Sequence, residues 1–243
     1  MKRFILTILL LLTYSIAGAA DPDILIKFFG HSGITDKRSI YHGEMLQYYV
    51  NEPTLGEGLP KNVLAKFRPL EETKINAVYA VLLSDGRKTQ DWYAYLVKEN
   101  EIWKLSAIRN LALSGVFYSA LKELETTNQR TVEEEWQYQN MLLMIKSDTE
   151  LKTFLINNLN YFKKVYSLFS NGRIKQSEIE AKRLFINHVG YNGAVFELNI
   201  GGILDNSVGY LYVPPGTNPP KMSPSDFIYV EEVADRWYIY KTT

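Results

Sequence analysis

The plainest candidates for chemistry in this sequence are its three histidines, His31, His42 and His188. None stands at the spacing of a metal motif such as H-x-x-x-H, and the chain has no cysteine to complete a zinc site. His42 stands two residues before Glu44, so this pair can act as general acid and base if the fold brings both into one pocket. The segment also reads as a polar turn entering a strand, and we favour that interpretation. We therefore assign no catalytic residue, metal ligand or cofactor.

Other catalytic motifs are absent, and one acidic run has an ordinary explanation. The sequence has no G-x-S-x-G nucleophile elbow and no glycine-rich phosphate loop. Three acidic residues follow one another at Glu133, Glu134 and Glu135, at a predicted helix start. Acidic side chains favour the positive end of the helix dipole, so we interpret this run as a helix start and not as a cation site.

Aromatic residues are the most informative group, at 13% of the chain with 17 tyrosines. Alternate residues of a strand share one face, so Tyr93 and Tyr95 point the same way. A ligand held on an aromatic sheet face would contact six candidates: Tyr93, Tyr95, Tyr210, Tyr212, Phe227 and Tyr229. The alternative, which we favour, is that these rings form core contacts and cross-strand pairs.

The elements that must position these residues begin with strands. Apolar residues alternate over 74–83, and Asp85-Gly86 follows, which is the strongest short-range hairpin signal. The returning strand is predicted at 91–97, and a tight turn at 98–101 leads to a strand at 102–108. Upstream, we predict strands at 45–50 and 63–67, and a further strand or a loose leader at 24–29.

Helices are predicted in the middle of the chain and strands in its last third. Apolar residues recur at helical spacing over 113–124, and capping boxes at Thr131 with Glu134 and at Ser147 with Glu150 predict helices at 132–146 and 148–170. The later patterning predicts strands at 184–189, 194–200, 207–213, 227–232 and 237–240. The proline-rich segment 214–225 is predicted to be a stiff, solvent-exposed loop.

These elements predict an α+β protein in which antiparallel β-meanders pack on a central group of helices. We divide the chain into a signal peptide at 1–20, an N-terminal β-rich domain at 21–110, and a helical segment with a C-terminal antiparallel sheet at 111–243. One alignment between the two halves places Trp103 on Trp237, Tyr93 on Phe227, Tyr95 on Tyr229 and Leu105 on Ile239. A duplication and a chance similarity explain this alignment equally well.

The N-terminus has the three zones of a secretory signal peptide. Lys2 and Arg3 precede an apolar run at 4–12, and small residues follow at 17–20. The run is shorter than the roughly 20 residues of a membrane-spanning helix. We therefore expect an exported protein, periplasmic or secreted, with no membrane anchor. Without residues 1–20 the chain has 25 basic and 27 acidic residues, a formal charge of −2, which argues against a nucleic-acid partner.

One segment resembles a known family. In residues 92–105, WYAYLVKENEIWKL, a strand ends in a charged turn and the next strand opens with Trp103, Lys104 and Leu105. This segment resembles the closing hairpin of NTF2-like proteins, and the order of helices and strands in 111–243 is similar to an NTF2-like or cystatin-like arrangement. The first half departs from that pattern, because no helices are predicted ahead of its strands. The resemblance implies a fold shared by small enzymes, ligand carriers and interaction modules, and no functional residue is carried over.

Taken together, the sequence favours a non-catalytic binding protein that holds a protein partner or a small apolar ligand on an aromatic-rich sheet. The alternative is a small NTF2-like enzyme, a hydrolase or isomerase, that uses His42 with a carboxylate. A pocket that holds His42 or His188 beside a carboxylate favours the enzyme.

The signal peptide gives a direct prediction. We expect the exported chain to begin at Ala20 or Asp21, because these positions follow the small residues after the apolar run. Mass spectrometry of the protein recovered from outside the cytoplasm checks this. A chain that retains Met1 there would contradict the cleavage, and a chain found only in the cytoplasm would contradict the expected location.

Overall fold

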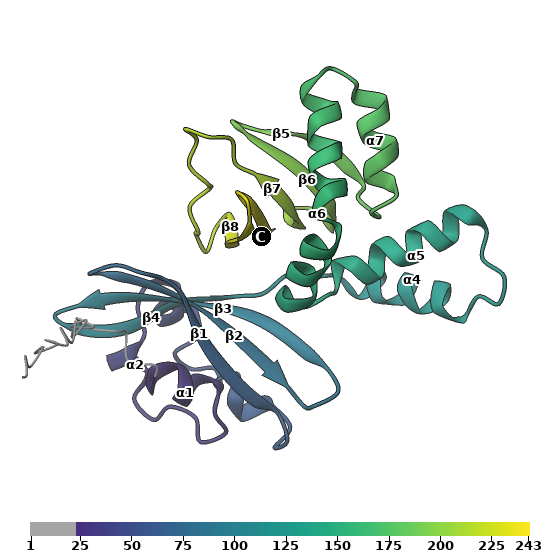
Figure 1. The fold of residues 1–243 in the computed structure, drawn as a ribbon. Coiled ribbons are helices and arrows are strands. Elements are labelled where there is room, and N and C mark those ends of the chain that lie inside the picture. Colours follow the sequence, from purple (N-terminus) through teal and green to yellow (C-terminus); the bar gives the residue numbers. More distant parts are fainter. Residues whose placement is uncertain (1–22) are drawn as a thin grey trace, which may run out of the picture.

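The computed structural model describes residues 23–243, so the predicted signal peptide at 1–20 lies outside the described residues. Within them the chain forms seven α-helices and two antiparallel sheets, which makes it an α+β protein (Figure 1). The first sheet has the order β1-β2-β3-β4 and comprises β1 (Leu64–Glu72), β2 (Asn76–Ser84), β3 (Thr89–Glu99) and β4 (Ile102–Arg109). The second has the order β5-β6-β7-β9-β8 and comprises β5 (His188–Asn192), β6 (Val195–Ile203), β7 (Asn206–Tyr212), β8 (Phe227–Ala234) and β9 (Trp237–Thr242).

Short helices cover one face of the first sheet, and they correct two predictions. The segment 24–29, predicted as a strand or a loose leader, belongs to α1 (Asp23–Phe29). The segment 45–50, predicted as a strand, belongs to α3 (Gly43–Tyr48), with α2 (Lys37–Ile40) between them. In α1 the buried residues Leu25, Phe28 and Phe29 follow helical spacing. An apolar run this short fits a strand as well as a helix, so periodicity alone cannot choose between them. Helices therefore do precede the strands of the first half.

The opposite face of the first sheet packs against the rest of the chain. Val78, Tyr93, Tyr95 and Ala107 belong to the same buried cluster as the inward residues of β6 to β9 and of α6 (Asp148–Ser170). Tyr95 Oη donates to the carbonyl of Ile228 over 3.0 Å. A shared core thus joins the two sheets across the predicted boundary at residue 110, and the division at that residue stays a prediction.

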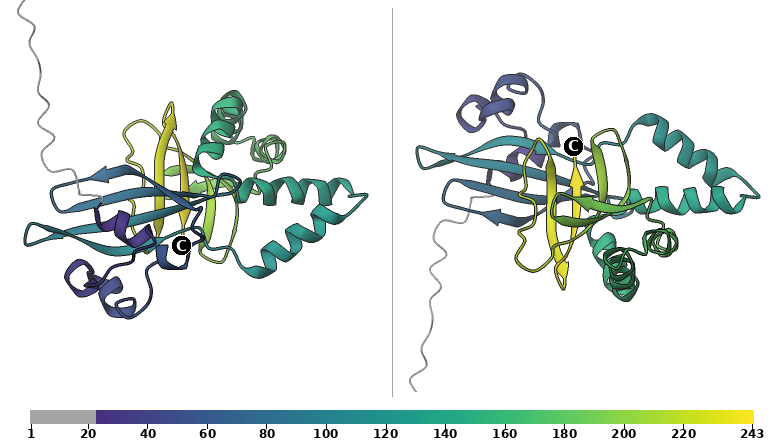
Figure 2. Two further views of the ribbon diagram at one scale, coloured as in Figure 1. Left: turned by 90° about the horizontal axis from the view of Figure 1, so that it is seen from below. Right: turned by 90° about the horizontal axis from the view of Figure 1, so that it is seen from above.

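The helices begin where their caps predict. Both capping boxes are present, Thr131 with Glu134 before α5 (Val132–Met144) and Ser147 with Glu150 before α6. α4 (Gly115–Thr126) and α5 form a hairpin that extends away from both sheets (Figure 2). Asn140 of α5 fixes the base of this hairpin to the second sheet, because the Nδ2 of Asn140 donates to the carbonyls of Phe185 and Ile200 over 2.7 Å each.

The second sheet agrees with the predicted strands except at its start. The segment 184–189 was predicted as one strand, but β5 begins only at His188 and α7 (Ile174–Lys182) precedes it. The sequence did not predict α7, because only Ser177 and Ala181 of that helix are buried and no apolar stripe marks it. The proline-rich segment forms the loop between β7 and β8, and Arg236 donates to the carbonyls of Pro214 and Thr217 within it.

The packing of α6 gives a test of the core. Phe162 is fully buried, with its ring 4.8 Å from that of Tyr210 and 5.4 Å from that of Trp237. We expect Phe162→Ala to lower the free energy of unfolding by about 3–5 kcal/mol, because it leaves a cavity between the helix and the sheet. A urea titration measures this.

The neighbouring residue supplies a matched control. Tyr161 is 50% exposed on the same helix, so Tyr161→Ala should change the free energy of unfolding by no more than about 0.5 kcal/mol. Equal effects from the two substitutions would mean that α6 does not pack on the sheet through this face.

Candidate ligand-binding groove and the polar network beneath it

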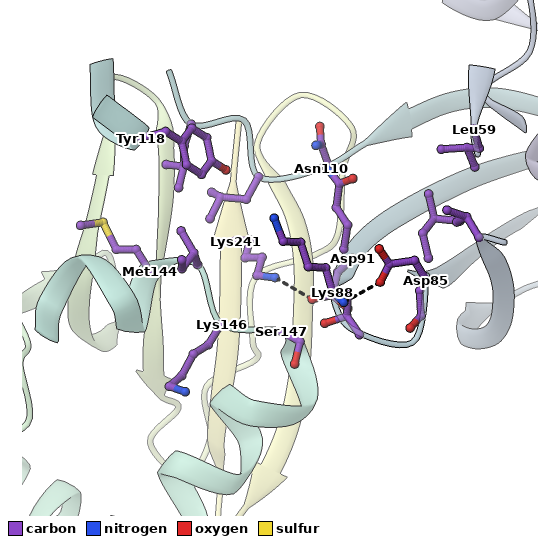
Figure 3. A pocket seen from close by; sticks show the side chains of 18 residues that line it. Leu59, Asp85, Lys88, Asp91, Asn110, Tyr118, Met144, Lys146, Ser147 and Lys241 are labelled. Atoms are coloured by element: carbon purple, nitrogen blue, oxygen red, sulfur yellow. Dashed lines mark hydrogen bonds and ion pairs between the residues drawn. The ribbon is translucent and has the colours of Figure 1, made fainter. Parts of the chain in front are cut away.

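A groove with a volume of about 680 Å³ lies where the β2–β3 turn approaches the segment 110–113, α4 and the α5–α6 junction (Figure 3). This volume lies within the range of small-molecule sites. Much of its wall is apolar and comes from Leu59, Val63, Leu83, Leu111, Leu113, Tyr118, Met144 and Ile145. The groove is therefore an amphipathic site at the junction of the two sheets.

The floor of the groove is a buried ion cluster. Lys241 of β9 lies with its Nζ 2.7 Å from Asp148 Oδ1 and 3.4 Å from Asp91 Oδ2. The side chains of Lys241, Asp148 and Asp91 are only 4%, 7% and 11% exposed. The backbone N–H of Asp148, in the first turn of α6, donates to Asp91 Oδ2 over 2.8 Å. One lysine thus holds together the first sheet, the start of α6 and the second sheet.

Two stacked tyrosines continue the cluster. The rings of Tyr93 and Tyr229 lie 4.9 Å apart and almost parallel. Tyr93 Oη donates to Asp148 over 2.8 Å, and Tyr229 Oη donates to Glu231 over 2.7 Å. Lys241 Nζ lies 5.7 and 5.9 Å from the centres of these rings, within the reach of a cation–π interaction.

Glu231 completes the network on the side of β1. Arg68 donates two hydrogen bonds to it, over 3.0 and 2.6 Å, and Lys152 of α6 donates a third over 2.7 Å. The network therefore contains three acidic and three basic side chains, so their formal charges cancel. Its ionised members are Asp91, Asp148, Glu231, Arg68, Lys152 and Lys241.

The protonation states follow from burial and pairing. Burial raises the pKa of Asp91 above its ordinary value, although Lys241 acts against this rise. Burial acts to lower the pKa of Lys241, but the carboxylates of Asp148 and Asp91 outweigh it and raise that pKa. An ammonium held in its charged form has no lone pair, so Lys241 acts as a fixed cation and not as a nucleophile or base.

The six aromatic candidates lie in the core and not in the lining of the groove. Tyr93, Tyr95, Tyr210, Phe227 and Tyr229 are buried, and Tyr212 is half-buried. Tyr93 stacks on Tyr229, and Tyr210 Oη donates to the carbonyl of Leu151 over 3.0 Å. The rings contact one another and the rest of the core, so their role as a ligand surface stays a prediction.

The histidines lie apart from the groove. Glu44 forms two hydrogen bonds with Arg109, over 2.5 and 2.7 Å, while His42 is the N-terminal cap residue of α3. His31 Nδ1 lies 3.1 Å from the carbonyl oxygen of Gly56, and His188 is exposed in β5. Neither this groove nor a second one of about 550 Å³ beside α1 has a histidine in its lining.

Two kinds of feature are absent from the part of the chain that the structure describes. Within residues 23–243 no three His, Cys, Asp or Glu side chains are grouped in a way that could hold a metal ion. The same residues contain no helix with the length and apolar character needed to cross a membrane.

The sequence interpretation missed the network, although one signal pointed to it. Lys241 lies on the same face of β9 as Trp237 and Ile239, which both belong to the core. Asp91 lies on the same face of β3 as Tyr93, which also belongs to the core. A charged residue on the core-facing side of a strand requires a buried partner. That rule identifies Lys241 and Asp91, but it does not say that they meet.

Comparisons with protein-family models, with curated proteins and with solved structures found no match for this chain. We therefore infer the function from the geometry of the groove and of the network beneath it.

The network gives a prediction about stability and pH. Lys241→Met should lower the free energy of unfolding by about 3–5 kcal/mol near neutral pH, because it leaves two buried carboxylates without their cation. Loss of the ammonium also raises the pKa of Asp91 further. A carboxyl with a raised folded-state pKa stabilises the fold below that pKa, and this contribution is lost as the pH rises through it.

The stability of Lys241→Met should therefore fall more steeply than that of the parent chain as the pH rises above about 4, the ordinary pKa of an aspartate. Urea titrations at several pH values measure this. Lys163→Met is the matched control, because Lys163 forms an exposed ion pair with Asp235 and should contribute at most about 1 kcal/mol. Parallel pH profiles for Lys241→Met and the parent would show that the carboxylates do not depend on Lys241.

Proposed function

We propose that the protein is an exported, non-catalytic binding protein that holds a small, mainly apolar ligand in the groove at the junction of its two sheets. The observation that carries this proposal is the apolar wall of the groove, set above a floor of charged groups. Sites for small molecules commonly combine an apolar lining with a few placed polar groups. The location rests on the signal-peptide pattern of residues 1–20.

The state of the charged groups supports binding over catalysis. Asp91 and Lys241 at the floor are bound to each other and to Asp148. A general base needs a lone pair that is accessible to substrate, and the hydrogen bonds of this cluster engage the groups that would supply one. The His42 enzyme remains the alternative, but Glu44 is engaged by Arg109. The resemblance of residues 92–105 to NTF2-like proteins stays a prediction, and the proposed ligand binding rests on the groove and not on that resemblance.

The proposal is tested with a neutral apolar dye, N-phenylnaphthylamine, whose fluorescence rises in an apolar site. We expect saturable binding to the purified protein. Tyr118 lines the groove and is 51% exposed, so Tyr118→Ala should fold normally and weaken dye binding about three- to tenfold, through loss of apolar contact area.

Tyr48→Ala is the matched control. Tyr48 is 64% exposed on α3 and is not part of the lining of the groove, so this variant should bind the dye as the parent does. Absence of saturable binding, or equal losses in both variants, would contradict the proposal.

A further inference from the structure

The carboxylate of Asp91 has one oxygen that the protein leaves unpaired. Its Oδ2 accepts the backbone N–H of Asp148 over 2.8 Å and lies 3.4 Å from Lys241 Nζ. Its Oδ1 has no hydrogen-bond donor among residues 23–243, yet it is not buried out of the reach of water. Asp91 is 11% exposed and belongs to the lining of the groove. This oxygen therefore opens to the groove, where it can accept a hydrogen bond.

The charges next to Asp91 are one cation short of balance. Asp91 and Asp148 share the single ammonium of Lys241. Burial raises the pKa of the Asp91 carboxyl, Lys241 acts to lower that pKa, and Asp148 acts to raise it again. Because the pKa stays above its ordinary value, one ammonium does not fully compensate the two carboxylates.

The other two cations of the network are directed away from the groove. Arg68 and Lys152 both donate to Glu231, and neither contributes to the lining. The positive end of the network thus lies outside the groove, and the end that faces the groove is negative.

The remaining charges of the lining are already paired. Asp85 and Lys88 attract each other within the β2–β3 turn, and Lys146 pairs with Glu150 over 3.2 Å. The charged side chains of the lining, taken with their partners, are three lysines and four acids: Lys88, Lys146, Lys241, Asp85, Asp91, Asp148 and Glu150. Their formal charge is −1, so a ligand that complements the groove carries one positive charge.

The surroundings of Asp91 suit an ammonium attached to a hydrocarbon. Tyr118 and Met144 of the apolar wall lie on one side of Lys241, and Asp91 lies on the other (Figure 3). The lining also contains Asn110, whose amide oxygen can accept a further N–H of an ammonium. A cationic head at Asp91 thus leaves the apolar wall free to contact the rest of the ligand.

We infer that the ligand is a small amphipathic primary amine, whose ammonium donates to Asp91 Oδ1 and whose hydrocarbon part lies against the apolar wall. This inference rests on the proposed function and specifies the ligand class of the same groove. The bound ammonium supplies the second cation for the two carboxylates. It keeps its proton, because the pKa of an alkyl ammonium is about 10 and that of an aspartate about 4. The contact is therefore one of binding and not of proton transfer.

The test compares three probes with the same chain length, dodecylamine, dodecanol and dodecanoate, by titration calorimetry at neutral pH and below their micelle concentrations. We expect dodecylamine to bind about five- to tenfold more tightly than dodecanol, because a hydrogen bond between charged groups is stronger than one to a neutral hydroxyl. Dodecanoate should bind most weakly, since its carboxylate would meet that of Asp91.

A fourth probe separates the hydrogen bond from the charge and needs no variant. Dodecyltrimethylammonium carries the same charge and chain but has no N–H to donate. It should bind more weakly than dodecylamine. Equal binding of these two cations would overturn the assigned contact at Asp91 Oδ1.

Asp91→Asn should lower the affinity for dodecylamine to that for dodecanol. The new side chain keeps an oxygen for the N–H of Asp148 and leaves Lys241 paired with Asp148, so we expect this variant to fold. Asp205→Asn is the matched control, because Asp205 is exposed and lies outside the lining. It removes the same formal charge from the protein and should keep the preference for dodecylamine.

The outcomes separate the two proposals. Equal binding of dodecylamine and dodecanol, tighter binding of dodecanoate, or equal effects of the two substitutions would overturn the amine inference and leave the groove as an apolar site. Failure of dodecylamine, dodecanol and dodecanoate alike to bind would overturn both the inference and the proposed function.

Discussion

The position of the two sheets relative to each other depends on the ion network around Lys241. Six ionised side chains from β1, β3, α6, β8 and β9 meet there with the stacked rings of Tyr93 and Tyr229. Removing these charges from water costs several kcal/mol per ion, and their mutual attraction repays this only when the geometry is good. Apolar contacts tolerate small shifts between packed surfaces, whereas hydrogen bonds of 2.6–3.0 Å do not. The network thus specifies one arrangement of the sheets more than it adds to net stability.

That arrangement creates the groove. The β2–β3 turn belongs to the first sheet, while Met144, Ser147 and Lys241 belong to the helices and the second sheet. Their separation is set by the bond from Asp148 N–H to Asp91, which fixes the start of α6 against β3. The capping box of Ser147 and Glu150 orients the same turn of α6. A local capping signal and a long-range ion pair therefore act on the same residues to position the wall of the site.

The sequence predicts the elements whose signals are local. The hairpin at Asp85-Gly86, the capping boxes at Thr131 and Ser147, and the α+β class are confirmed. Neither α1 nor α3 was predicted as a helix, because their apolar runs are too short to show a period: the first was predicted as a strand or a loose leader and the second as a strand. The groove was not predicted, because its lining comes from segments between residues 59 and 241 that only the fold brings together. The position of Lys241 on the core-facing side of its strand is a signal of a buried charge that the sequence interpretation did not use, and it does not identify the partners in β3 and α6.

The shared position of network and groove has a physical consequence for any ligand. Asp91 and Lys241 are members of the network and of the groove lining at once. A ligand above them would exclude water from this ion pair, and the attraction between two charges grows as the surrounding dielectric falls. Occupation of the groove would then strengthen the contact that holds the two sheets together. By linkage, any loss of that contact would weaken ligand binding by the same free energy, even for substitutions that the ligand does not touch. Binding and the packing of the two sheets are in this way one coupled equilibrium, with Asp91 and Lys241 as the residues common to both.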